Sequence, residues 1–156
     1  MTFTSDLLIL INMCVGIAFT ALLFYRFPKL PPAKNAEDFP SVSIIIPARN
    51  EEKNLQLLLE DLQSQSVKPH EIICVNDDSS DNTAGVAQTF GATLINLNSK
   101  PEGWTGKTWA CQNGADLASG SLLLFLDADV RLRKDGLARL VQAHQAADCS
   151  ISVQPF

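Results

Sequence analysis

Residues 42–51 read Val-Ser-Ile-Ile-Ile-Pro-Ala-Arg-Asn-Glu, an apolar run that a proline ends and polar residues follow. The run predicts a buried β-strand over 42–46, and leucines at helical spacing predict a helix over 51–65. The same order repeats along the chain: strands are predicted over 71–75, 93–97 and 122–126, helices over 81–90, 107–118 and 134–147, and a last strand from 151. Strands that alternate with helices predict an α/β fold with a mostly parallel sheet and flanking helices.

The composition excludes two broad classes of protein. Hydrophobic residues make up 46% of the 156 residues and charged residues 19%, which excludes a long disordered chain. The formal net charge is −5, whereas non-specific nucleic-acid binding needs a surplus of lysine and arginine, so we expect no nucleic-acid partner. The four cysteines lie far apart and form no Cys-x-x-Cys pair, so we expect neither a zinc site nor a disulfide framework.

The first part of the chain has a different character. Of the 19 residues from Leu7 to Tyr25, 16 are apolar and none is charged. As a helix this run would measure about 28 Å, close to the thickness of the hydrocarbon core of a bilayer. A buried core helix and a cleaved signal peptide are the alternatives, but no basic residue precedes the run and bulky residues follow it. We therefore predict an uncleaved transmembrane anchor over residues 1–27.

The residues that follow the anchor predict its orientation. Three basic residues follow the apolar run: Arg26, Lys29 and Lys34. By the positive-inside rule they place the rest of the chain in the cytoplasm, at the cell membrane. Four prolines between residues 28 and 40 predict an extended linker, which leaves residues 41–156 as one domain.

Acidic residues follow two of the predicted strands. Asp77 and Asp78 come after the second strand, where a turn with a helix cap is an equal alternative to a functional role. Asp127 and Asp129 come after 122–126, a run that is apolar throughout and is predicted to lie in the centre of the sheet. Because parallel strands end at one edge, these carboxylates are expected to share a crevice, where a divalent cation would offset their repulsion.

A glycine-containing segment opens the helix predicted from residue 107. It reads Lys-Pro-Glu-Gly-Trp-Thr-Gly-Lys-Thr-Trp over residues 100–109, and Lys107 would add a positive charge to the backbone N–H groups there. A Walker A loop needs a glycine where Pro101 stands, so that assignment is weak. A crevice with carboxylates, a cation and a Gly-Lys loop suits a nucleoside diphosphate that carries a transferable group.

Four motifs together resemble the family 2 glycosyltransferases, which have the GT-A fold. The motifs are Ser-Ile-Ile-Ile-Pro-Ala-Arg-Asn-Glu at 43–51, Val-Asn-Asp-Asp-Ser-Ser-Asp-Asn-Thr at 75–83, Gly-Lys at 106–107 with Ala110 and Asn113-Gly114, and Leu-Asp-Ala-Asp at 126–129. One departure is Ser79, which stands where the family usually has glycine. The resemblance implies a UDP-sugar or a similar nucleotide-sugar donor and Mg²⁺ or Mn²⁺. It also implies an inverting reaction, in which an acceptor hydroxyl attacks the anomeric carbon as the diphosphate leaves.

The resemblance also implies roles for single residues. Asp78 would contact the base, Lys107 the base or the diphosphate, and Asp127 the ribose and donor sugar. Asp129 of the D-x-D motif would bind the metal, with Asp127 as a second candidate ligand. The residues expected to line the nucleotide are Pro47, Ala48, Arg49, Asn50 and Glu51.

The chain resembles only the N-terminal, donor-binding half of such enzymes. The catalytic base belongs to the acceptor-binding half, so no residue here is assigned to that role. The apolar run and the segment 101–107 narrow the resemblance to a membrane-associated branch that includes carotenoid-acid and hopanoid-associated glycosyltransferases, with polyisoprenoid-type lipid acceptors. The alternative is a truncated, non-catalytic, membrane-anchored module that binds nucleotides.

Overall fold

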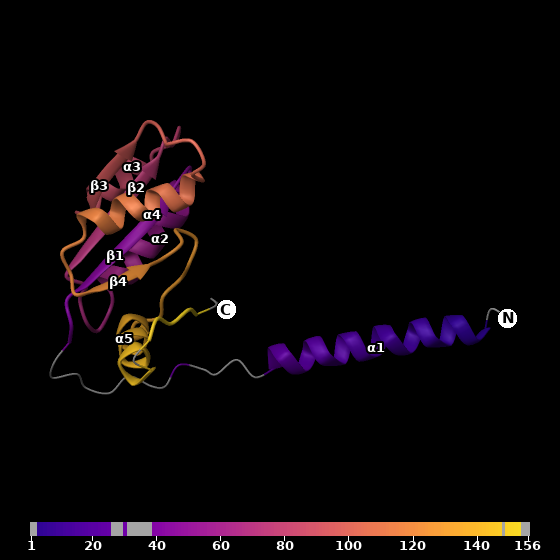
Figure 1. Ribbon diagram of the computed structural model, residues 1–156. Coiled ribbons are helices and arrows are strands. Elements are labelled where there is room, and N and C mark those ends of the chain that lie inside the picture. The colour runs from indigo at the N-terminus through magenta and orange to yellow at the C-terminus, as the bar shows by residue number, and fades with distance from the viewer. Residues whose placement is uncertain (1–2, 26–29, 31–38, 148, 154–156) are drawn as a thin grey trace. The chain divides into compact units, whose positions relative to one another are not determined.

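A computed structural model of the chain describes residues 3–25, 30, 39–147 and 149–153. The chain divides into two compact units, Met1–Leu30 and Pro31–Phe156 (Figure 1).

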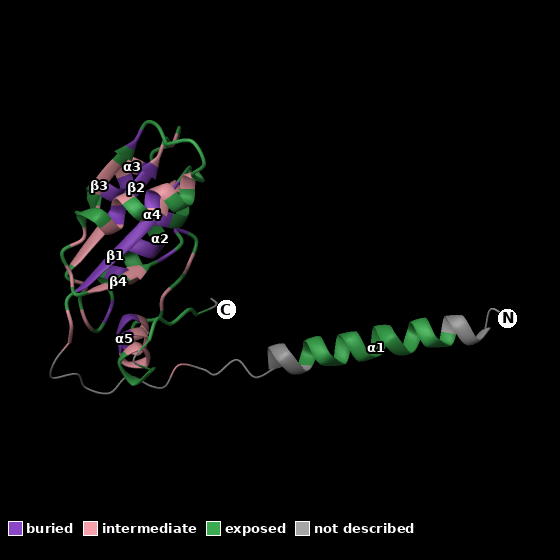
Figure 2. Cartoon of the chain, viewed as in Figure 1, coloured by how far each residue is buried: buried purple, intermediate pink, exposed green. Residues whose placement is uncertain are grey.

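The first unit holds one helix, α1, over Phe3–Tyr25. Large apolar side chains between Leu7 and Phe19 are exposed along it, as Figure 2 shows in green. Among the helices in the described part of the chain, none meets both the length and the hydropathy needed to cross a bilayer. The predicted anchor over residues 1–27 therefore stays a prediction, and most of the predicted linker over 28–40 falls outside the described residues.

The second unit is built on a four-stranded parallel sheet. Its strands are β1 (Val42–Ala48), β2 (Glu71–Asp77), β3 (Thr93–Leu97) and β4 (Leu122–Phe125), in the order β3-β2-β1-β4. The central strand β1 is buried along nearly its whole length, because isoleucine and valine fill both of its faces (Figure 2). The predicted α/β fold with a parallel sheet is confirmed.

Helices cover both faces of this sheet. They are α2 (Glu52–Gln63), α3 (Thr83–Thr89), α4 (Gly106–Leu117) and α5 (Gly136–Ala147). Buried residues of α2, α3 and α5 pack with Ile44 and Ile46 on one face of β1, whereas Ala110 of α4 packs with Ile45 on the other. The four buried leucines of α2 recur at the spacing that predicted this helix: Leu55, Leu58, Leu59 and Leu62.

Pro47 lies within β1 and does not end the strand there. It still pairs in register with Val75 of β2. The carbonyl of Ile45 accepts the Leu126 N–H at 3.0 Å, so residues 45 and 47 turn their backbone polar groups toward β4. Because β4 ends at Phe125, the N–H that proline lacks would have had no strand partner on that side.

Two predictions about the sheet are wrong. In the sheet that the described residues form, β4 lies at the edge and not in the centre. Its run is apolar on both faces, but Leu123 and Phe125, 46% and 48% exposed, lie on the face of the sheet where α4 packs mainly on β1 and β2. Residues 151–153 form no strand and are exposed.

Candidate functional site

The ends of β1, β2 and β4 lie at one edge of the sheet because all of the strands are parallel. In that order β2 and β4 lie on either side of β1, so the residues that follow them are separated by about two strand spacings, or roughly 10 Å. Helix α4 runs back across the sheet, and its first turn lies at the same edge. The loops that carry the predicted site residues thus share one edge, as the sequence predicted.

Asp77 ties the end of β2 to the start of α4. Its carboxylate occupies the space that a β-carbon on Gly106 would need, and its Oδ2 lies 3.6 Å from Nη1 of Arg49. The Asp77 side chain is only 18% exposed, whereas that of Arg49 is 61% exposed. Arg49 from the first motif, Asp77 from the second and Gly106 from the third are therefore neighbours.

Lys107, one residue further along α4, reaches the loop after β4. Its Nζ lies 2.6 Å from Oδ1 of Asp127. The hydrogen bond to Asp127 is the main reason why the pKa of Lys107 is raised above its ordinary value, so the ammonium stays charged at neutral pH. Both side chains are more than half exposed, so a ligand with stronger negative charge can draw the ammonium away from the carboxylate.

The D-x-D motif forms a turn whose middle residue anchors it. Ala128 is buried in the core, while Asp127 and Asp129 on either side of it are exposed. The Val130 N–H donates to the Asp127 carbonyl at 3.2 Å and closes the turn. The turn therefore presents both carboxylates at the edge of the sheet.

These two carboxylates suit only one kind of metal site. Within the described ranges, no three histidine, cysteine, aspartate or glutamate side chains come together as a metal cluster. A fully protein-built metal centre does not fit there. Mg²⁺, however, is commonly held by one or two carboxylates together with substrate phosphates. The residues fit a cation that the phosphates of a ligand complete.

Serine at position 79 does not disturb its turn. Asp78, not Ser79, has the positive φ of 54°, so the position that is usually glycine in the family needs no left-handed backbone here. The hydroxyl of Ser79 instead accepts the N–H of Asn50 at 3.0 Å. Asp78 itself is exposed at the same edge of the sheet.

The remaining predicted residues lie at the end of β1 with different exposure. Ala48 is 3% exposed and packs in the core, so any contact of Ala48 with a ligand would use its backbone. Pro47 is half-buried in the strand. The Glu51 carboxylate accepts a hydrogen bond from Nδ2 of Asn54 at 2.7 Å. Sequence reasoning did not predict that Gly106 packs against Asp77 or that Ser79 bonds to Asn50, because these contacts join loops that are distant in sequence.

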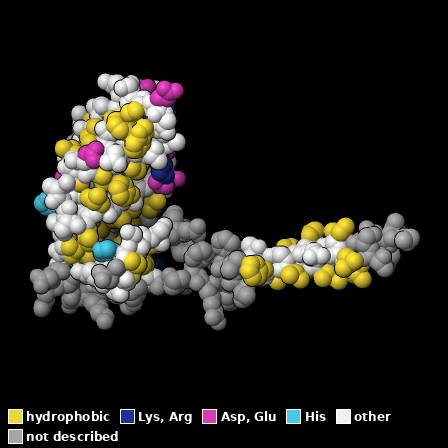
Figure 3. Space-filling view, viewed as in Figure 1, with side chains coloured by type: hydrophobic (Ala, Val, Ile, Leu, Met, Phe, Trp, Pro, Cys, Tyr) yellow, Lys and Arg dark blue, Asp and Glu magenta, His cyan; other side chains and the backbone are white. Residues whose placement is uncertain are grey.

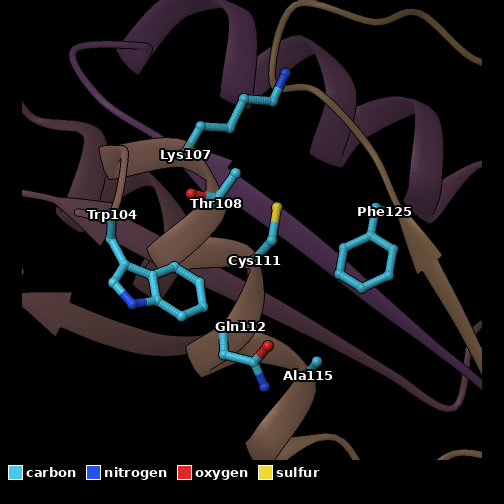
Figure 4. Close-up of a pocket in the computed structure, with 7 residues that line it drawn as sticks. All are labelled: Trp104, Lys107, Thr108, Cys111, Gln112, Ala115 and Phe125. Atoms are coloured by element: carbon cyan, nitrogen blue, oxygen red, sulfur yellow. The ribbon is translucent and has the colours of Figure 1, made fainter. Parts of the chain in front are cut away.

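A shallow pocket of about 370 Å³ lies beside α4 and is largely distinct from the predicted site. Figure 4 shows Trp104 and Cys111 on the helix side and Phe125 of β4 facing them. Of the predicted site residues, only Lys107 lines it, and its amino group extends away from the pocket. Much of the face seen in Figure 3 is likewise apolar, whereas the charged groups of the predicted site belong to the edge of the sheet.

Comparison with known proteins gives relatives over most of the chain. The family model "Glycosyl transferase family 2" matches residues 43–156. A 4,4'-diaponeurosporenoate glycosyltransferase of Staphylococcus aureus is 38% identical over 148 residues, which are 92% of this chain and 39% of that protein. One of the same name from Staphylococcus haemolyticus is 41% identical over 128 residues, 79% of this chain and 34% of that protein. The chain thus spans less than half the length of these curated relatives.

Solved structures share the fold. Residues 1–349 of S. aureus TarS, solved in complex with UDP, are 26% identical with a TM-score of 0.56, over 67% of this chain and 33% of that one. The mannosyltransferase PcManGT from Pyrobaculum calidifontis, solved with GDP-Man and Mn²⁺, has a TM-score of 0.61 over 84% of this chain and 43% of that one. At 23% identity, this second likeness shows the fold alone.

Proposed function

The chain belongs to glycosyl transferase family 2, and on that premise we propose that residues 41–156 bind a nucleotide-diphosphate sugar, such as a UDP-sugar, for transfer of its sugar. The family that the sequence motifs resemble is thereby confirmed. The observation that carries the proposal is the first turn of α4, where Gly106 packs against Asp77 and Lys107 pairs with Asp127. Cationic and acidic groups from three loops meet there, as recognition of a diphosphate and a nucleoside requires.

Each charged group of the site has a distinct part in this proposal. Lys107 would exchange Asp127 for the diphosphate and stabilise the negative charge that develops as the diphosphate leaves. Asp127, once released, would accept hydrogen bonds from ribose or sugar hydroxyls. Arg49 and Asp78 would hold the nucleoside from the ends of β1 and β2. The UDP bound by TarS supports a donor of this class.

We propose that a divalent cation, Mg²⁺ or Mn²⁺, binds together with the phosphates of the donor. Asp129, with Asp127 as a second candidate ligand, would hold it from the turn after β4. When bound, the cation would neutralise charge on the diphosphate as a Lewis acid.

We propose a membrane lipid of the polyisoprenoid type as the acceptor. The support is the name shared by the two Staphylococcus relatives, which specifies 4,4'-diaponeurosporenoate.

We also propose that residues 1–27 anchor the chain in the cell membrane, with the domain in the cytoplasm. The polar side chains of Asn12 and Thr20 support this, since they donate to carbonyls four residues earlier in α1, at 2.9 and 2.8 Å.

Calorimetric titration with UDP tests the donor site directly. We expect UDP to bind in the presence of Mn²⁺, and Asp129→Asn to remove the metal-dependent part of the binding. Asp116→Asn is the matched control, because Asp116 is exposed on the same unit and bonds only to Gln112 of its own helix among the contacts described. If the unaltered chain binds neither UDP nor GDP with either metal, the proposed donor site is wrong.

Transfer of a radiolabelled sugar into a lipid extract separates an enzyme from a non-catalytic binding module. If the 156-residue chain forms product, it is an enzyme and not only a binding module. If it binds UDP but transfers no sugar, it behaves as the non-catalytic module.

The anomeric configuration of the product, measured by NMR, tests the predicted inversion. Alkaline extraction of membranes tests the anchor: the chain should stay with the lipid, and a variant without residues 1–27 should not.

A further inference from the structure

The N-terminal backbone of α2 is held by side chains from another loop. Three successive N–H groups, those of residues 50, 51 and 52, donate to side chains in the loop after β2 and at the first residue of α3. Their acceptors are Ser79 Oγ at 3.0 Å, Thr83 Oγ1 at 2.9 Å and Asp81 Oδ2 at 3.1 Å. A helix N-terminus often binds an anionic ligand through such groups, but here the protein itself occupies them. The end of α2 therefore joins two loops of the site and is not open to phosphate.

Asn50 makes this connection reciprocal. Its Oδ1 accepts the N–H of Ser80 at 2.8 Å and the Ser80 hydroxyl at 3.2 Å, while its own N–H donates to Ser79. Asn50 has a φ of 55°, in the left-handed region that asparagine tolerates better than most residues other than glycine. Asp78, next to Ser79, has a φ of 54°. Asn50 makes these hydrogen bonds itself and Asp78 is next to Ser79, which accepts one of them, so both uncommon backbone conformations occur at this connection.

These hydrogen bonds hold the backbone next to two side chains that are predicted to contact the ligand. Arg49 directly precedes Asn50, and Asp78 directly precedes Ser79. Among the described contacts, the Arg49 side chain pairs with Asp77 at 3.6 Å, which is a long and partly exposed contact. The pairing of β1 with β2 ends at Ala48 and Asn76, so beyond that point the bonds of Asn50 to Ser79 and Ser80 hold the two loops together next to Arg49 and Asp78.

We propose that Asn50 is a positioning residue, which through Ser79 and Ser80 sets the separation of Arg49 and Asp78 that grips the nucleoside part of the donor. This rests on the proposed function and refines it. The resemblance assigned Asn50 to the nucleotide lining, whereas its N–H and Oδ1 are both engaged with the second loop. Asn50 acts on the nucleoside half of the donor and not on the diphosphate, which lies toward Lys107.

Two variants weaken the connection from opposite sides. Asn50→Gly keeps the left-handed backbone accessible but removes the Oδ1 acceptor, and Ser79→Ala removes the acceptor of the Asn50 N–H. We expect each to weaken UDP binding about tenfold, and the double variant to lose less than the two losses combined, since they break one connection. The matched control is Asn54→Ala, which removes an exposed asparagine of α2 that bonds only to Glu51 among the described contacts.

Competition with inorganic pyrophosphate separates positioning from general damage to the fold. We expect Asn50→Gly to bind pyrophosphate with Mg²⁺ as the unaltered chain does, and to melt within a few degrees of it. The inference is overturned if Asn50→Gly binds UDP with unchanged affinity, or if UDP and pyrophosphate affinities fall together. If the unaltered chain binds no nucleoside diphosphate, the proposed function fails first, and the positioning role fails with it.

Discussion

The ammonium of Lys107, in the first turn of α4, lies 2.6 Å from Oδ1 of Asp127 in the turn after β4. This pair joins two segments of the chain through solvent-exposed side chains, 62% and 53% exposed. Exposed pairs add little to stability, because solvent screens their attraction and both side chains lose rotamer freedom. The pair is therefore better suited to a change of partner on ligand binding than to holding the fold together.

Lys107→Ala should accordingly separate ligand binding from stability. We expect the free energy of unfolding to change by less than about 1 kcal/mol, while UDP affinity falls at least about tenfold with loss of a charged hydrogen-bond donor. Chemical denaturation and calorimetric titration measure the two effects. Lys53→Ala, which removes an exposed lysine of α2, should leave both unchanged. Equal UDP affinity in the two variants would show that Lys107 has no part in the donor site.

Gly106→Ala tests the contact between α4 and β2. A β-carbon there meets the Asp77 carboxylate, which pairs with Arg49 and is only 18% exposed, so it has less room to rotate away than an exposed side chain. We therefore expect a cost of about 1–3 kcal/mol in the free energy of unfolding. In an Asp77→Ala background the same substitution should cost much less, because the colliding atoms are gone. Denaturant unfolding of the four variants measures the coupling. An equal cost in both backgrounds would contradict the close approach of Gly106 and Asp77.

Gly114→Ala tests how closely α4 packs on the sheet. The added β-carbon would lie 2.5 Å from Cγ2 of the fully buried Ile45, so we expect a loss of about 1–3 kcal/mol in the free energy of unfolding. The control is Gly85→Ala in α3, where the β-carbon meets only the side chain of Asn82, which can rotate away. That substitution should be neutral or stabilise by up to about 1 kcal/mol through helix propensity. In thermal melts the midpoint should therefore fall for Gly114→Ala and stay unchanged or rise for Gly85→Ala.

Glu71 gives the fold a dependence on acidic pH. Hydrogen bonds from the Ser43 hydroxyl, then from the backbone N–H and hydroxyl of Ser119, lower the pKa of Glu71 from 4.5 to about 2. Because the pKa is lower in the folded state, the stabilisation is complete above pH 4.5 and is lost as the pH falls toward about 2. Glu71 lies at the start of β2, at the opposite end of the strand from Asp77, so this effect belongs to the fold and not to the site.

Glu71→Gln removes the titration but keeps acceptors for the same hydrogen bonds. The midpoint of urea unfolding should fall less steeply for Glu71→Gln than for the unaltered chain as the pH is lowered from 4.5 to about 2. Glu60→Gln, on the exposed side of α2, serves as the control and should follow the unaltered chain. Parallel curves for Glu71→Gln and the unaltered chain would mean that another group causes the acid sensitivity.

The order of strands and helices could be predicted from the sequence because apolar periodicity is local. The leucines of α2 and the isoleucines of β1 specify which face is buried before any tertiary contact is considered. The edge position of β4 could not be predicted in this way. An apolar run indicates burial, but Leu123 and Phe125 stay about half exposed because α4 packs mainly on β1 and β2.

By itself, the sequence determined the α/β class, the four motifs and the edge at which they gather, since parallel strands bring all of their carboxyl ends together. Which motif residues touch depends on how the strands and helices pack. This packing pairs Lys107 with Asp127, brings Asp77 against Gly106 and joins Asn50 to Ser79 and Ser80. These contacts connect residues far apart in the chain, and their distances depend on strand register and helix packing, which no local pattern of residue types encodes.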